Sequence, residues 1–111
     1  MKKGDIVLVW FPFTDFESEK VRPAVVLIPE NFYRDVCVAF ITSRITRGPD
    51  CVLIDETQKG FIKTGLKVSS TIRVGKIVTL QVSLVASVIG SLLPNHLAEL
   101  NRALKRIFKL T

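Results

Sequence analysis

Apolar residues in this chain gather in short runs, separated by polar segments that contain glycine and proline. The first run, DIVLVWFPF at residues 5–13, shows little alternation between apolar and polar positions. Such a run is typical of a strand buried on both faces, as in a small barrel. Five further runs have the length and composition of strands. They cover residues 23–28, 36–43, 51–55, 66–72 with a continuation at 76–80, and 85–92.

The last part of the chain changes to a helical period. Pro94 suits the first turn of a helix, so we expect a helix over residues 95–109. The apolar residues predicted to face the core are Leu97, Leu100, Leu104, Ile107 and Phe108. The whole pattern predicts a mainly β fold, a small β-barrel with one C-terminal α-helix, in a single domain at residues 1–111.

Composition and charge indicate an ordered protein with an anionic partner. Apolar residues make up 48% and charged residues 23% of the 111 residues, which is typical of a folded domain with a hydrophobic core. No apolar stretch reaches the ~18 residues of a membrane helix, and no signal peptide is recognised, so we expect a cytoplasmic protein. A net charge of +6 favours nucleic acid or an acidic protein as partner, without choosing between them.

The residues on which most enzymes depend are scattered along this chain. Cys37 and Cys51 lie in apolar runs with no histidine nearby, which predicts buried, reduced thiols. His96 is the single histidine, and we expect it at the surface or at the helix start. The ten carboxylates are dispersed, and no glycine-rich phosphate loop is present. The sequence therefore predicts no metal site and no cofactor.

Polar residues at two strand ends form the most informative group. Arg22 precedes the apolar run at 23–28, while Thr42 and Ser43 end the run at 36–43. If these strands pair as antiparallel neighbours, the start of one and the end of the other lie at the same edge of the sheet. A guanidinium and two hydroxyls would then converge, a combination that binds phosphate. The alternative is that they are solvated strand-end residues.

Four stretches in order along the chain carry a resemblance to a known family. They are GDIVLVWFPFTDFESEKVRPAVVL, FITS at 40–43, TIRVGKIVTL, and GSLLPNHLAELNRAL. The first resembles a Gly-Asp-hydrophobic strand, a variable loop and an Arg-Pro step before an aliphatic strand. Together they are similar to the PemK/MazF family, the toxin half of type II toxin–antitoxin pairs, over essentially the whole chain.

The resemblance implies a fold, an activity and partners. The fold is a small SH3-like β-barrel of the PemK/MazF/CcdB type that forms a homodimer. The activity is that of an endoribonuclease (an mRNA interferase), which cuts single-stranded RNA without a metal, and the partner protein is an acidic antitoxin. The catalytic pair of the family corresponds to Arg22 and Thr42 here. Some members carry a carboxylate where this chain has Ser70, and a histidine in the loop at 14–20, so the resemblance identifies no general base.

Within this picture the reaction is a transesterification in which the ribose 2′-hydroxyl attacks the adjacent phosphorus. Arg22 is expected to stabilise the developing charge, and Thr42 to donate a hydrogen bond. The further RNA-binding residues are predicted to be Ser43, Ser70, Arg73 and Phe16. For Arg73 the alternative is a structural ion pair; Phe16 would stack on unpaired bases.

Two other functions remain open from the sequence. A protein-directed toxin of the same fold, like the gyrase poisons, would need an exposed apolar tip on its C-terminal helix. A non-catalytic nucleic-acid-binding barrel would need only the positive charge.

Overall fold

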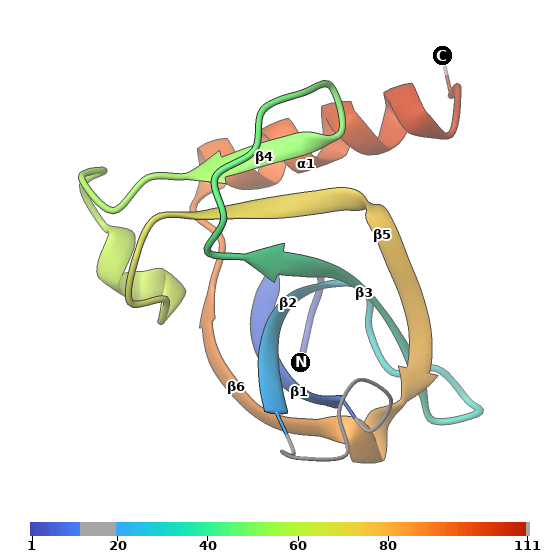
Figure 1. The fold of residues 1–111 in the computed structure, drawn as a ribbon. Helices are drawn as coiled ribbons and strands as arrows, with labels where there is room; N and C mark the ends of the chain where they lie inside the picture. The colour runs from blue at the N-terminus through green and yellow to red at the C-terminus, as the bar shows by residue number, and fades with distance from the viewer. Residues whose placement is uncertain (12–19, 111) are drawn as a thin grey trace.

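The computed structural model describes residues 1–11 and 20–110, which form six strands, one α-helix and two short 3-10 helices (Figure 1). The strands are β1 (Asp5–Phe11), β2 (Lys20–Ile28), β3 (Asp35–Thr42), β4 (Cys51–Ile54), β5 (Ser70–Gln81) and β6 (Val85–Ser91). The helices are η1 (Phe61–Thr64), η2 (Val82–Leu84) and α1 (Pro94–Ile107). The six predicted strands and the C-terminal helix are therefore confirmed.

All six strands belong to one antiparallel sheet in the order β4-β5-β3-β2-β1-β6. The sheet curls strongly, and Figure 1 shows β6 and β5 curving around the central strands. Within the described residues, the edge strands β4 and β6 are not hydrogen-bonded to each other. The mainly β fold with a C-terminal helix is confirmed, and its barrel is an open one.

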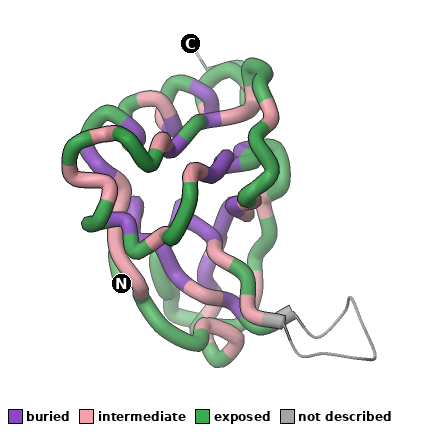
Figure 2. The backbone as a smooth tube through the Cα atoms, turned by 60° about the vertical axis from the view of Figure 1, so that its left-hand side comes forward, coloured by how far each residue is buried: buried purple, intermediate pink, exposed green. Residues whose placement is uncertain are grey.

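Apolar residues are buried in two clusters on the two faces of this sheet, and Figure 2 shows in purple where the buried residues lie along the backbone. One cluster lies under α1 and includes Ile6, Ile72 and Leu100. The other includes Val7 and Val9, on the opposite face. Because neighbouring residues of a strand point to opposite faces, β1 contributes to both clusters. This confirms the prediction of a doubly buried first strand.

Two strands begin elsewhere than their apolar runs indicate. β2 begins at Lys20, so Pro23 lies inside the strand and not at its start. Pro23 pairs with Leu8 of β1, whereas the pairing of β2 with β3 begins only at Ala24. On that side Pro23 occupies an edge-like position, where the missing N–H is tolerated. β5 begins at Ser70, so the prediction of a strand from 66 is wrong.

The helix α1 packs its predicted apolar face on the sheet, with one exception. Leu100 is fully buried, and Leu97, Leu104 and Ile107 pack against the same cluster. Phe108 is 58% exposed because the helix ends at Ile107 and the chain turns away, so its predicted core position is wrong. Among the described helices, none has the length and apolar character that crossing a bilayer requires.

Candidate functional site

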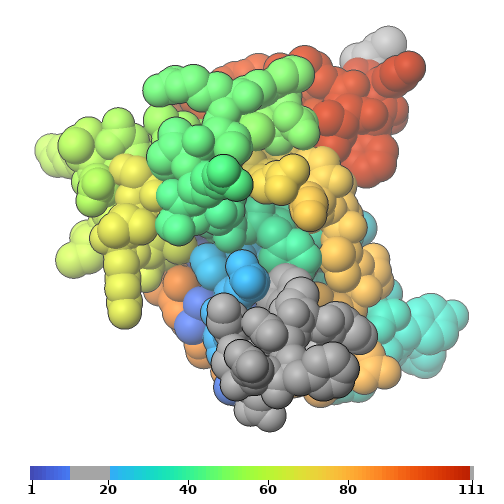
Figure 3. Space-filling model, in the orientation of Figure 1, coloured from blue at the N-terminus to red at the C-terminus, as the bar shows by residue number. Residues whose placement is uncertain are grey.

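A pocket of about 430 Å³ lies where β2 begins and β3 ends. Its polar lining consists of Arg22, Thr42, Ser43, Lys67 and Ser70. Four of these five residues were predicted from the sequence as site residues. Figure 3 shows the three contributing segments bordering one another: the start of β2 in blue, the end of β3 in green and the segment before β5 in yellow.

The antiparallel pairing of β2 with β3 brings Arg22 and Thr42 to one end of the two strands. β2 and β3 are antiparallel neighbours, as predicted, and Ala24 pairs with Phe40. This is the last pair toward that end of the two strands, and Arg22 and Thr42, each two residues beyond it, both line the pocket. Arg22 also pairs with Val9 of β1, which holds the strand on its other side. The guanidinium is thus carried by a strand with defined neighbours, and its side chain is exposed.

The hydroxyl of Thr42 has a fixed acceptor role. Its Oγ1 accepts a hydrogen bond from the backbone N–H of Arg44, at 3.1 Å. A hydroxyl has one proton to donate and two lone pairs that accept. The acceptance from Arg44 therefore leaves the proton of Thr42 to point toward a ligand. The side chain is half-buried, which limits its rotation.

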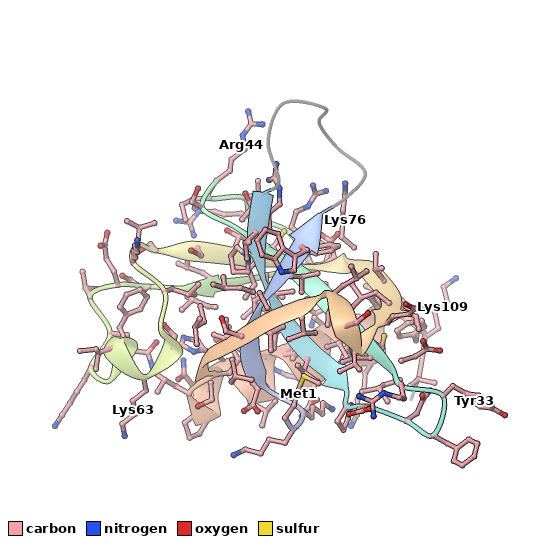
Figure 4. All side chains as sticks on the ribbon, turned by 90° about the horizontal axis from the view of Figure 1, so that it is seen from below. Met1, Tyr33, Arg44, Lys63, Lys76 and Lys109 are labelled. Atoms are coloured by element: carbon pink, nitrogen blue, oxygen red, sulfur yellow. The ribbon has the colours of Figure 1, made fainter. Side chains whose placement is uncertain are left out.

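The loop after β3 is tied to the sheet by similar contacts. Thr42 pairs with Thr71 of β5. The Oγ1 of Thr71 accepts a hydrogen bond from the backbone N–H of Thr46, at 3.2 Å. Figure 4 shows the side chain of Arg44 projecting from this loop into solvent. The loop therefore adds an exposed cation close to the pocket rim.

The two serines of the pocket differ in what they can offer a ligand. Ser43 is exposed at the end of β3. Ser70 is only 4% exposed, and its Oγ donates to the carbonyl of Val68 at 2.9 Å. Because its single proton is used in that bond, Ser70 can act toward RNA as an acceptor.

Two predicted RNA-binding residues lie outside this pocket or outside the described residues. Arg73 is exposed on β5, opposite Cys51 of β4, and does not belong to the described lining. Within the described part of the chain, one ion pair is found, between Arg34 and Glu30. Arg73 therefore forms no ion pair with the described residues. Phe16 and the loop at 14–19 lie outside the described residues, so base stacking by Phe16 stays a prediction.

One part of the pocket wall was missed in the sequence. Residues 65–68 form a wall that contributes Gly65, Leu66, Lys67 and Val68 to the lining. Sequence reasoning assigned 66–68 to a strand because of its apolar residues. The signal that could have corrected this is Gly65, which has a φ of +74°, a conformation that ends the short helix η1.

The wall is held against β6 by contacts between backbones. A Cβ on Gly65 would lie 2.1 Å from the carbonyl oxygen of Ile89, and one on Gly90 would lie 2.3 Å from the carbonyl of Thr64. Only glycine allows such an approach. Thr64 is fully buried, donates from Oγ1 to the carbonyl of Phe61 and accepts from the N–H of Leu66. The wall is therefore locally well fixed.

His96 lies away from this pocket, at the start of α1. It is 1% exposed, so the helix-start prediction is confirmed and a surface position is wrong. Its Nδ1 accepts a hydrogen bond from the backbone N–H of Leu93, and its Nε2 has no partner among the described residues. Burial lowers the pKa of His96, and the charge of Glu99 opposes this in part.

The remaining candidate ligands are dispersed in the folded chain as well. In the part of the chain that the structure describes, no three His, Cys, Asp or Glu residues gather as a metal site would require. Cys37 and Cys51 are free and half-buried. The Sγ of Cys51 lies 3.4 Å from Oγ1 of Thr46.

Nearly the whole of this chain matches the model of a known family. The family model of PemK-like, MazF-like toxins of type II toxin–antitoxin systems matches residues 2–108. The chain belongs to this family.

Solved structures give the same fold. A MazF in a MazE–MazF structure from Deinococcus radiodurans has a TM-score of 0.77 and 21% identity, covering 100% of this chain and 97% of that chain. A MazF toxin of Mycobacterium tuberculosis has a TM-score of 0.71 and 24% identity, covering 96% and 98%. A mycobacterial endoribonuclease bound to its cognate antitoxin has a TM-score of 0.72 and 17% identity, covering 100% and 97%. Among curated proteins, none matches this chain significantly.

Proposed function

We propose that this toxin is an endoribonuclease that cleaves single-stranded RNA, including mRNA, without a metal ion. The observation that carries the proposal is that Arg22 and Thr42, from the antiparallel neighbours β2 and β3, line one pocket. Family membership supports it, as does the likeness in fold to a mycobacterial protein described as an endoribonuclease. The polar side chains of the pocket are cations and hydroxyls, which match a phosphodiester.

The proposed reaction is a transesterification. The ribose 2′-oxygen attacks the adjacent phosphorus, and the bond between phosphorus and the 5′-oxygen breaks. One proton passes overall from the 2′-oxygen to the 5′-oxygen, so the products are a cyclic phosphate and a 5′-hydroxyl. The guanidinium of Arg22 stabilises the charge that grows on the phosphorane oxygens. Because a guanidinium stays protonated, it acts as a charge stabiliser and a donor, and does not accept the 2′ proton.

The other side chains hold the RNA around this centre. Thr42 donates its proton to the same phosphoryl group, since the hydrogen bond from the N–H of Arg44 uses a lone pair and leaves that proton available. Ser43 donates from the rim, and Ser70 accepts from a ribose hydroxyl or a base amino group. The proposal also includes Arg73 and Phe16 as residues that bind further nucleotides of the strand.

The same proposal includes two protein partners. A net charge of +6 favours an acidic antitoxin segment. Two of the similar toxins are solved together with their antitoxins. We propose that such a segment covers Arg22 and that the toxin acts as a cytoplasmic homodimer.

The test uses a long transcript incubated with the purified toxin in excess chelator. The cleavage sites are mapped, and a short RNA with a 2′-deoxy sugar at one mapped site is compared with the all-ribose version. We expect cleavage in chelator, a cyclic phosphate product and no cleavage at the deoxy position. Cleavage that needs added magnesium, or that proceeds at the deoxy sugar, contradicts the proposed chemistry.

A second candidate function has one observation in its favour. Phe108 and Leu110 at the end of α1 are 58% and 62% exposed, an apolar tip such as a protein-directed toxin requires. The two functions are separated by expressing Arg22→Ala and the pair Phe108→Ser with Leu110→Ser in growing cells. The ribonuclease proposal requires that only Arg22→Ala abolishes toxicity.

A further inference from the structure

The pocket contains a cation that the proposed reaction leaves unused. Lys67 lines the same pocket as Arg22 and Thr42 but comes from the wall at 65–68, not from β2 or β3. Its side chain is exposed, so the ammonium can reach a ligand that enters from solvent. Figure 3 shows the segment that carries it as the yellow border of this face.

Lys67 is presented by a fixed backbone. Gly65, two residues earlier, packs on the backbone of Ile89, and Gly90 packs on the carbonyl of Thr64. Ser70, three residues later, is buried and donates to the carbonyl of Val68. The backbone around Lys67 is thus held on both sides. Little backbone entropy is therefore lost when Lys67 binds a ligand.

The position of Lys67 differs from that of a nearby lysine in the connection between β4 and β5. Lys63 lies in the last turn of η1, and Figure 4 shows its side chain projecting outward from the molecule. Among the described residues that line the pocket, Lys67 is the single lysine. The position of Lys67 is therefore distinct from a general spread of positive charge over this segment.

The chemistry of the wall suits one nucleotide of an extended strand. An ammonium on a flexible stem is a compact charge with three donors, and it binds a non-bridging phosphate oxygen without demanding planar geometry. Leu66 and Val68 flank it in the lining, and Val68 is 48% exposed. These apolar side chains can contact a ribose or base while the ammonium holds the phosphate.

We propose that Lys67 is a substrate-positioning residue that binds a backbone phosphate next to the one held by Arg22 and Thr42. It sets the register of the RNA, so that the scissile phosphate falls at Arg22. This inference rests on the proposed ribonuclease function.

The test measures the affinity for a short RNA with a 2′-deoxy cleavage site at several salt concentrations. The variants are Lys67→Ala, Lys67→Arg and, as matched control, Lys63→Ala. Each phosphate contact to a single strand contributes ~0.7 to the slope of log K against log salt. We expect Lys67→Ala to lose about this amount of slope, and Lys67→Arg and Lys63→Ala to keep it. Cleavage of the all-ribose RNA should show a raised KM for Lys67→Ala with kcat nearly unchanged, as loss of uniform binding requires.

The outcomes separate this inference from the proposed function. A Lys67→Ala protein that cleaves RNA with the parent slope and KM overturns the role of Lys67 and leaves the ribonuclease intact. The same result follows if Lys63→Ala loses as much slope, since the effect is then one of general charge. A parent protein that neither binds nor cleaves RNA overturns both. Circular dichroism melts confirm that each variant is folded.

Discussion

At the residue scale, Thr42 shows how a single hydrogen bond can decide the role of a hydroxyl. Its oxygen accepts from the N–H of Arg44, so its proton remains for a ligand. Ser70 shows the reverse, since it donates to Val68 and keeps only its lone pairs. Residue type alone treats the two hydroxyls alike, whereas their local partners leave Thr42 with a proton to donate and Ser70 without one.

Arg22→Ala should lower the rate of RNA cleavage by ~100-fold or more, which corresponds to the roughly 2.7–4 kcal/mol of one preorganised donor. Arg22→Lys should restore the rate only in part, because an ammonium lacks the planar fork. The measurement is single-turnover cleavage, with thermal melts to show that the fold is kept. A folded Arg22→Ala protein with the parent rate would reduce this arginine to a solvated strand entry.

Thr42→Ala should cause a smaller loss than Arg22→Ala, and Thr42→Ser should retain most of the activity because it keeps the donor. The double change of Arg22 and Thr42 should cost less than the sum of the two single changes, since both side chains serve one phosphate. The same single-turnover assay gives all four rates. Strictly additive losses would mean that the two side chains act on separate groups.

His96 should make the stability of the protein fall in mild acid. Its pKa in the folded state lies below the ordinary value of 6.5, because burial disfavours the charged ring. The unfolded chain then binds the proton more readily, so stability is lost as the pH falls below ~6.5 and the loss levels off below the folded pKa. Urea unfolding from pH 8 to pH 5 measures this loss, and His96→Gln should show less of it. An identical pH dependence in both proteins would assign the effect to other groups.

At the element scale, the pocket depends on an irregular connection as much as on regular strands. β2 and β3 supply the side chains that would hold the phosphate, while the wall at 65–68 is a loop that packs through glycines. β5 supports both parts, since it pairs with β3 along its length. Its register is interrupted between Ala39 and Ile41 of β3, and Figure 1 shows the bend of β5 there.

Gly90→Ala should destabilise the protein by about 1–3 kcal/mol, the usual range for an inserted methyl group in a packed site. The new Cβ would lie 2.3 Å from the backbone carbonyl of Thr64, which cannot move without displacing the wall. Gly75→Ala is the control, because its Cβ would meet only the side chain of Asp50, at 3.2 Å. Urea unfolding measures both. An equal loss of unfolding free energy in the two variants would show that the wall at 65–68 shifts without cost to accommodate the methyl group.

At the scale of the whole molecule, charge and shape determine what the toxin meets. The net charge of +6 draws polyanions to the protein, and the pocket at the start of β2 gives them a specific place to bind. Both RNA and an acidic antitoxin segment would respond to the same field. If the proposed activity holds, competition between them for one surface is the simplest way for an antitoxin to inhibit it.

The protein should be a dimer at micromolar concentration, and a peptide of the acidic antitoxin segment should inhibit RNA cleavage. Replacing the acidic residues of the peptide by their amides should weaken inhibition, most strongly at low salt, because surface charges are screened as salt rises. Light scattering gives the mass, and inhibition curves at two salt concentrations give the charge effect. A monomeric mass would contradict the predicted dimer. Equal inhibition by the amide peptide would show that its acidic charges do not contribute to binding.

Much of the fold follows from the sequence by itself, because apolar periodicity reports which residues need burial. Several elements lie in the structure where the pattern predicts them: the strand β1 that is buried on both faces, the strands around 36–43 and 51–55, and the helix α1. The sequence also predicted that Arg22 and Thr42 converge if their strands pair, and the family resemblance proposed them as a catalytic pair. The rule that antiparallel neighbours share an edge predicted the convergence, and the resemblance supplied the proposed role.

Only the tertiary structure decided the rest, because it depends on contacts between distant segments. The wall that carries Lys67 exists because Gly65 meets the backbone of Ile89, and no local pattern encodes a contact across that distance. Pro23 is tolerated inside β2 because β3 stops pairing at Ala24. Phe108 is exposed because α1 ends one residue before it, although its spacing matches the buried face. Periodicity determines what must be buried, whereas the approach of one backbone to another determines where the loops and their cations lie.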